Sequence, residues 1–97
     1  MYNKDELAAL EADIRATFIA RKKELNMSDD ALGKMAFPYM ANPTGKVQAL
    51  FVGQGAGENR KPQNFRLGEI LNLCEALGLG KKWEDVIRHA IAELKKK

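Results

Sequence analysis

The stretch that decides the fold is MSDDALGKMAFPYMANPTGKVQALFVG, residues 27–53, which carries the start signals of two short helices. Ser28 is a preferred N-cap residue, and two aspartates follow it in the first turn, where the helix dipole favours acids. Pro38 ends this helix, because the residue before a proline avoids helical backbone angles. Asn42 and Pro43 then supply a second cap and a proline at the first helical position. The stretch therefore predicts two short helices joined by an apolar connection, residues 37–41, that packs onto the core.

The second of these helices is expected from Thr44 to about Val52. Its apolar spacing turns three side chains inward, those of Val47, Leu50 and Phe51. Three others are expected off that face, those of Lys46, Gln48 and Ala49. Gly45 weakens the first turn by about 1 kcal/mol relative to alanine, which indicates either a close approach to another group or a structural accident.

Further helices are predicted on both sides of this stretch. Residues 3–26 form one long helix whose apolar residues recur at helical spacing and share a face: Leu7, Leu10, Ile14, Phe18 and Leu25. After a glycine-rich basic segment, residues 53–62, a helix starts near Asn64 and ends at Gly78, a natural C-terminal stop. A C-terminal helix covers residues 82–95. No segment alternates like a strand, so we expect one all-α domain, residues 1–97, of about five helices with a central motif at 27–79.

Size, charge and apolar content place the chain among small globular proteins. It has 97 residues, 45% of them hydrophobic, and a formal net charge of +3. Basic residues cluster at 15–26, at 60–66 and at the C-terminus, which fits either a phosphate-binding face or a solvated surface. The single cysteine excludes an internal disulfide, and no apolar run approaches the roughly 20 residues that a membrane span needs. We therefore expect a cytoplasmic protein without a membrane partner.

The sequence offers no reactive constellation. His89 and Cys74 are each the only residue of their type, so they cannot form a familiar zinc site. Cys74 lies on the apolar side of its predicted helix, as a small hydrophobic residue does. The Gly-x-Gly-x-Gly run at 53–57 follows no strand and lacks the Gly-Lys-Ser/Thr ending of a phosphate-binding loop. We expect no catalytic residue, no metal, no cofactor and no small-molecule substrate.

Four pieces of the chain, in order, resemble the phage lambda-repressor-like helix-turn-helix DNA-binding family, the Cro and repressor group. Residues 25–36 are similar to the first motif helix, and residues 47–53 to the second motif helix with its closing glycine. Residues 60–62 resemble the basic-proline loop, and residues 70–79 the helix that ends in Ala-Leu-Gly. The chain departs from the family in its longer connections at 36–43 and 53–62. It also has Gly33 where the family usually has alanine.

The resemblance implies a lambda-repressor-like bundle in which residues 44–52 form the recognition helix. Gln48 is then expected to pair with adenine, and Lys46 to reach guanine or a phosphate. Gly45 would let the backbone approach the DNA closely. The remaining implied contacts are to phosphate and sugar. The implied DNA-binding residues are Ser28, Thr44, Gly45, Lys46, Gln48, Asn59, Arg60 and Lys61.

The expected function is a sequence-specific, non-enzymatic, DNA-binding transcriptional regulator of phage or prophage type, with double-stranded DNA as its partner. The apolar stripe from Trp83 to Leu94 serves either the core or a homodimer interface. The alternative is a protein-interaction module on the same fold, such as an antitoxin or a phage-related adaptor, that does not read DNA. One structural observation separates the two hypotheses. A DNA-binding protein needs a single exposed convex face formed by Thr44, Lys46, Gln48, Arg60 and Lys61, whereas scattered positions favour the protein-interaction module.

Overall fold

The long helix α1, Lys4–Glu24, has the predicted cap at its start. In the computed structural model, which describes residues 1–53, 61–79 and 83–96, the Asn3 side chain accepts the N–H of Glu6 at 2.9 Å. The Glu6 carboxylate in turn accepts the N–H of Asn3 at 3.0 Å, which completes a capping box. After α1 the backbone of Asn26 takes a positive φ of 52°, a conformation that asparagine tolerates better than most residues. The chain can therefore turn sharply into the next helix.

The helices α2, Asp29–Ala36, and α3, Pro43–Phe51, begin as the local signals predict. The Ser28 hydroxyl oxygen accepts the N–H of Ala31 at 3.0 Å, and the Asn42 side chain accepts the N–H of Gly45 at 3.1 Å. The connection between the helices differs from the prediction. Only Phe37 is buried, whereas residues 38–41 are exposed. Phe37 is therefore the one side chain of this segment that is buried in the core.

Helix α4, Leu67–Ala76, starts later than predicted. The helix begins after Arg66, because the Arg66 N–H donates to the Glu69 carboxylate at 2.9 Å and that bond caps its first turn. Phe65 stays outside the helix and packs edge-on against Phe18 of α1, with ring centroids 5.7 Å apart. The helix ends at Ala76, and Gly78 follows with a positive φ of 71°. The stop at Gly78 is confirmed, whereas the start near Asn64 is wrong.

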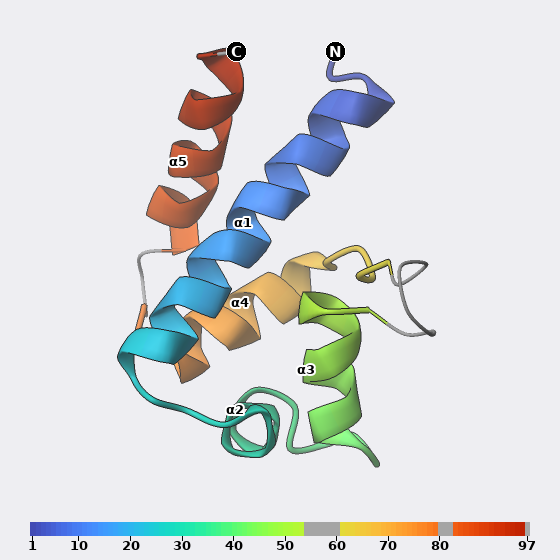
Figure 1. The fold of residues 1–97 in the computed structure, drawn as a ribbon, viewed down its shortest axis with the longest axis vertical. Helices are drawn as coiled ribbons and strands as arrows, with labels where there is room; N and C mark the ends of the chain where they lie inside the picture. The colour runs from blue at the N-terminus through green and yellow to red at the C-terminus, as the bar shows by residue number, and fades with distance from the viewer. Residues whose placement is uncertain (54–60, 80–82, 97) are drawn as a thin grey trace.

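The described residues contain five helices and no β-strand, so the prediction of an all-α fold is confirmed. Helix α5, Trp83–Lys95, lies beside α1, while α2 and α3 pack on each other at the opposite end of the molecule (Figure 1). Helix α4 lies between these two pairs (Figure 1). The elements that the resemblance assigns to DNA are thus remote from the ends of α1 and α5 that carry the first and last described residues.

The core gathers side chains from all five helices and from the connection after α2. The largest fully buried ones are Phe18, Phe37, Leu32, Leu50, Leu73 and Leu77. Two expectations about inward faces are wrong. Leu7 and Leu25 are exposed because the ends of α1 extend past the core. Ala49 is buried because residues 61–63 close over it, and the Gln63 N–H donates to the Ala49 carbonyl at 2.9 Å.

Candidate nucleic-acid interface

The N-terminal end of α3 is fixed against α2 by a close backbone approach. A Cβ atom on Gly33 would lie 2.7 Å from the backbone carbonyl carbon and oxygen of Pro43, so only glycine fits this packing. Beside it, the Thr44 hydroxyl donates to the Asp30 carboxylate at 2.9 Å. Hydrogen bonds from Lys34 and then from Thr44 lower the pKa of Asp30. Thr44 therefore links the two helices as well as lying at the start of α3.

Three of the implied DNA-binding residues lie along one accessible side of α3. Thr44 and Gly45 are half-buried in the first turn, and Gln48, one turn after Thr44, is exposed. The close approach expected at Gly45 is to the cap, since an added Cβ would lie 2.3 Å from the Asn42 amide nitrogen. Val52 is exposed at the end of the same side. This side of α3 presents a small polar strip.

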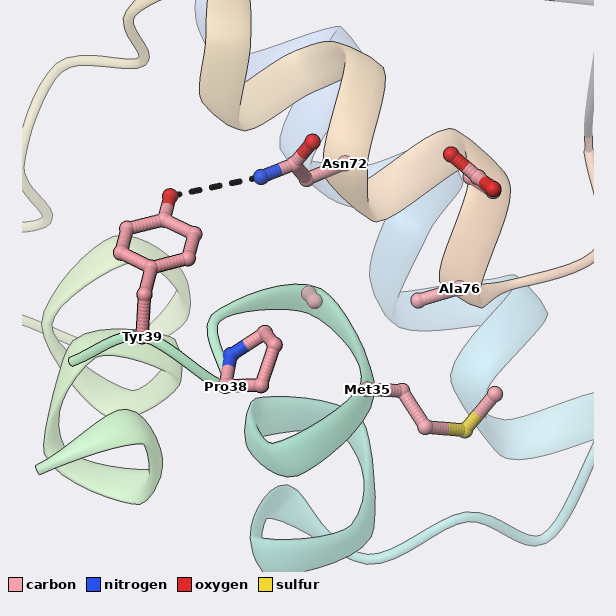
Figure 2. Close-up of a pocket in the computed structure, with 7 residues that line it drawn as sticks. Met35, Pro38, Tyr39, Asn72 and Ala76 are labelled. Carbon is pink, nitrogen blue, oxygen red and sulfur yellow. Dashed lines mark hydrogen bonds between the residues drawn. The ribbon is translucent and has the colours of Figure 1, made fainter.

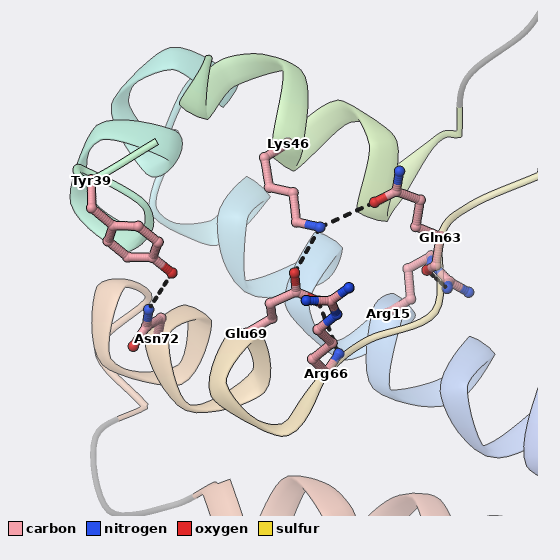
Figure 3. Close-up of polar contacts among 7 residues, drawn as sticks. All are labelled: Arg15, Tyr39, Lys46, Gln63, Arg66, Glu69 and Asn72. Atoms are coloured by element: carbon pink, nitrogen blue, oxygen red, sulfur yellow. Dashed lines mark hydrogen bonds and ion pairs between the residues drawn. The ribbon is translucent and has the colours of Figure 1, made fainter. Parts of the chain in front are cut away.

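Lys46 lies on a different side of α3 and is engaged within the protein. Its ammonium is 2.7 Å from one carboxylate oxygen of Glu69 and donates to the Gln63 side-chain oxygen at 3.1 Å (Figure 3). The side chain of Lys46 is 17% exposed and that of Glu69 is 12% exposed. The other oxygen of Glu69 accepts the Arg66 N–H that begins α4. Lys46 thus connects α3 to the first turn of α4.

Arg15 of α1 holds the C-terminal end of α3. Its Nε donates to the carbonyl of Leu50 at 2.7 Å, and its Nη2 donates to the carbonyl of Gln63 at 3.1 Å. The guanidinium also lies over the Phe65 ring, 5.2 Å from its centroid. Burial lowers the pKa of Arg15, against the raising effect of Glu11. Figure 3 shows Arg15, Gln63 and Lys46 around the segment that leads into α4.

Sequence reasoning missed Arg15, Gln63 and Glu69 as residues that position α3. Glu69 had a local signal, because a glutamate three residues after an N-cap often bonds back to the cap. That signal required the correct start of α4, at Arg66. Arg15 and Gln63 had no local signal, because their partners are distant in the chain.

The other implied residues lie apart from this strip. Ser28 caps α2, and Asp29 beside it is paired with Lys22 at 2.7 Å. Lys61 is exposed next to the end of α3, where a Cβ on Gly53 would meet its carbonyl carbon at 2.5 Å. Asn59 and Arg60 lie outside the described residues. Among the described residues, Thr44 and Gln48 share a side, whereas Lys46 is turned toward Glu69 and Gln63. Thr44, Lys46 and Gln48 therefore do not form the single exposed face that was expected of a DNA-binding surface.

A shallow hollow lies between α2, the connection after it and α4. Figure 2 shows Met35, Pro38 and Tyr39 on one side and Asn72 and Ala76 of α4 on the other. The Asn72 amide donates to the Tyr39 hydroxyl at 3.3 Å across the hollow. Met35 is 58% exposed and Tyr39 72% exposed, so this end of the molecule presents apolar surface to solvent.

The described residues hold no cluster of three potential metal ligands among histidine, cysteine, aspartate and glutamate. His89 is exposed, and its Nε2 atom lies 3.8 Å from an Asp13 carboxylate oxygen. Cys74 is buried, and burial raises the pKa of its thiol to about 11. Within residues 1–53, 61–79 and 83–96, no helix has the length and apolarity to cross a membrane.

Comparison with protein-family models, with curated proteins and with solved structures found no match to this chain.

Proposed function

We propose that this protein is a sequence-specific DNA-binding transcription regulator of phage type, built as a lambda-repressor-like bundle in which α2 and α3 form a helix-turn-helix. The observation that carries the proposal is the polar strip Thr44, Gly45 and Gln48 on the accessible side of α3. An α-helix fits the major groove of B-DNA, where base edges can be read. The regulator performs no catalytic step and uses no cofactor.

A reading helix must be held rigidly, and α3 is held at both ends. The packing of Gly33 on Pro43 and the bond from Thr44 to Asp30 fix its start. The bond from Arg15 to the Leu50 carbonyl fixes its end. Binding sites built on fixed helices keep their side chains in productive geometry better than sites on loops. This anchoring supports a recognition role for α3.

The proposal assigns the base contacts to the start and middle of α3. The proposal assigns pairing with N6 and N7 of adenine to the amide of Gln48, which is exposed, and a shorter contact at the rim to the half-buried Thr44. Lys61, exposed at the other end of α3, contacts a phosphate and so fixes position rather than sequence. Asn59 and Arg60 are proposed to continue that backbone contact, and Ser28 with the amides of the first turn of α2 to hold a second phosphate.

Binding to duplex DNA at a series of salt concentrations tests the proposal. Lys61→Ala is expected to weaken binding to all sequences and to reduce the slope of log K against log salt by about 0.9. Lys4→Ala, at the far end of α1, is the matched control and should leave the slope unchanged. Gln48→Ala should relax the preference at one base position, by about 1–3 kcal/mol. A wild-type chain that binds no DNA at low salt would refute the proposed function.

The second candidate is a protein-interaction module on the same fold, and the exposed Met35 and Tyr39 favour it. The internal pairing of Lys46 also favours it, because α3 then offers less free positive charge than its sequence indicates. Binding of the wild-type chain to duplex DNA separates the candidates, and the variants Met35→Glu and Tyr39→Glu show whether the exposed apolar surface takes part in that binding. A DNA regulator that reads with α3 should keep its DNA affinity in both variants, whereas a protein-interaction module shows no DNA binding to lose.

A further inference from the structure

We propose that Lys46 and Glu69 form a positioning pair that sets the orientation of α3 for DNA, and that Lys46 makes no phosphate or base contact. The inference rests on the proposed function and replaces the role that the sequence resemblance implies for Lys46. A residue of this kind controls affinity for the preferred site through the helix that carries Thr44 and Gln48.

The positive charge of Lys46 is compensated by contacts within the protein. The ammonium has a carboxylate oxygen of Glu69 at 2.7 Å and the side-chain oxygen of Gln63 at 3.1 Å. Both charged side chains are largely removed from solvent, at 17% and 12% exposure. Moving Lys46 to a phosphate would leave the Glu69 carboxylate, whose side chain is only 12% exposed, without its cation, which is unfavourable. The pair therefore stays formed when DNA binds.

Helix geometry separates Lys46 from the side of α3 that is proposed to read bases. Successive residues of an α-helix turn by about 100°, so Lys46 and Gln48 point in directions about 200° apart around the axis. Gln48 is exposed, whereas Lys46 is turned toward Gln63 and Glu69. A rotation of α3 that brought Lys46 to the groove would carry Gln48 out of it. The two residues cannot both contact the centre of the same groove.

Glu69 joins this contact to the rest of the fold. One of its oxygens accepts the Arg66 N–H at the start of α4 and the other binds Lys46 (Figure 3). Gln63 adds a second tie, because its backbone N–H donates to Ala49 and its carbonyl accepts from Arg15. The packing on α2 fixes the start of α3, and the Lys46–Glu69 pair fixes its rotation about its own axis. The pair thereby sets the direction in which Gln48 projects.

The first test compares Lys46→Met with Lys61→Met in salt titrations on a preferred duplex and on random duplex DNA. Methionine keeps most of the alkyl stem and removes the charge. Lys46→Met should leave the salt slope unchanged, because a lysine neutralised by Glu69 displaces no counterions, whereas Lys61→Met should reduce it by about 0.9. Lys46→Met should also weaken the preferred site about three- to tenfold without weakening random DNA equally. A slope reduced by about 0.9 in Lys46→Met would overturn the inference.

The second test needs no DNA and uses a double-mutant cycle on unfolding with Lys46→Met, Glu69→Gln and the double variant. Glutamine keeps an oxygen for the Arg66 N–H, so the cycle isolates the ion pair. The unfolding equilibrium constants should be non-additive by about fivefold or more. Additive effects would show that the pair does not hold α3 and would overturn the inference. If the wild type binds no DNA, the proposed function fails, and the cycle alone decides whether the pair fixes α3.

Discussion

Replacing Gly33 by alanine should separate α2 from α3 and destabilise the protein. The added methyl carbon would lie 2.7 Å from the carbonyl carbon and oxygen of Pro43 and 2.9 Å from the nitrogen of Thr44. All three are backbone atoms of the first turn of α3, which the Asn42 cap and the Thr44 bond to Asp30 also hold. The methyl group cannot be accommodated by moving a flexible side chain, so the helix itself has to shift.

Two opposing terms set the size of the effect. Overpacking of one carbon into a well-packed site costs about 1–3 kcal/mol. Alanine in place of glycine inside a helix returns about 0.8–1 kcal/mol of intrinsic helix propensity. The net loss is therefore about 1 kcal/mol, equivalent to a fall in Tm of about 4–8 °C for a domain of this size.

The assay is urea unfolding followed by far-ultraviolet circular dichroism, with Gly68→Ala as the matched control. A Cβ on Gly68, in the first turn of α4, would meet no atom within 4 Å. The control should therefore stabilise the protein by about 0.4–1 kcal/mol. A Gly33→Ala variant that gains stability as Gly68→Ala does would contradict the predicted clash with the first turn of α3. Such a result would mean that α2 and α3 leave room for the alanine usual in the family that the sequence resembles.

Substitutions at three further positions test the contacts of the core and of α3. Burial raises the pKa of the Cys74 thiol from 9.0 to about 11. The contribution of the neutral thiol to the free energy of unfolding is therefore complete below pH 9 and is lost as the pH rises through 11. Cys74→Ala should lack this loss in urea unfolding between pH 9 and 11, and an unchanged pH profile would contradict it. Arg15→Lys should lower the free energy of unfolding by about 1–3 kcal/mol in thermal unfolding, because an ammonium cannot reproduce the two forked bonds to the carbonyls of Leu50 and Gln63. Equal stability of the variant and the wild type would show that Arg15 does not hold the end of α3. Asn42→Ala should cost about 0.5–2 kcal/mol through loss of the α3 cap, whereas Asn42→Asp should retain most of the stability.

The starts of the first three helices were predictable because each signal and its effect lie within a few residues. Asn3, Ser28 and Asn42 all accept the backbone N–H three residues later. Pro38 limits α2 by a steric effect on its immediate neighbour. The start of α4 was misplaced because Arg66 is not a usual cap residue. The glutamate that bonds back to Arg66 is recognisable only once that start is known.

The inward faces were less predictable because burial depends on segments that are distant in the chain. Periodicity gave Leu7 and Leu25 the same face as Ile14, yet the buried residues of α1, Ile14 and Phe18, lie in the middle of the helix. Ala49 was expected off the inward face of α3, and residues 61–63 bury it. Helical spacing describes which residues share a side of a helix, whereas the fold decides which sides are covered.

The same distinction decides which basic residues can meet a nucleic acid. Residues 15–26 include four cations that fit either a phosphate-binding face or a solvated surface on sequence alone. In the fold, Arg15 bonds to the end of α3, Arg21 donates to the Leu77 carbonyl at 3.0 Å, and Lys22 pairs with Asp29. Three of the four therefore hold helices together, as Lys46 does, and clustering in the sequence overstates the charge available to a ligand. Lys61 is exposed at the end of α3, so it can contact a phosphate more readily than these three residues or Lys46. For this reason the test of function measures how Lys61→Ala changes the slope of log K against log salt.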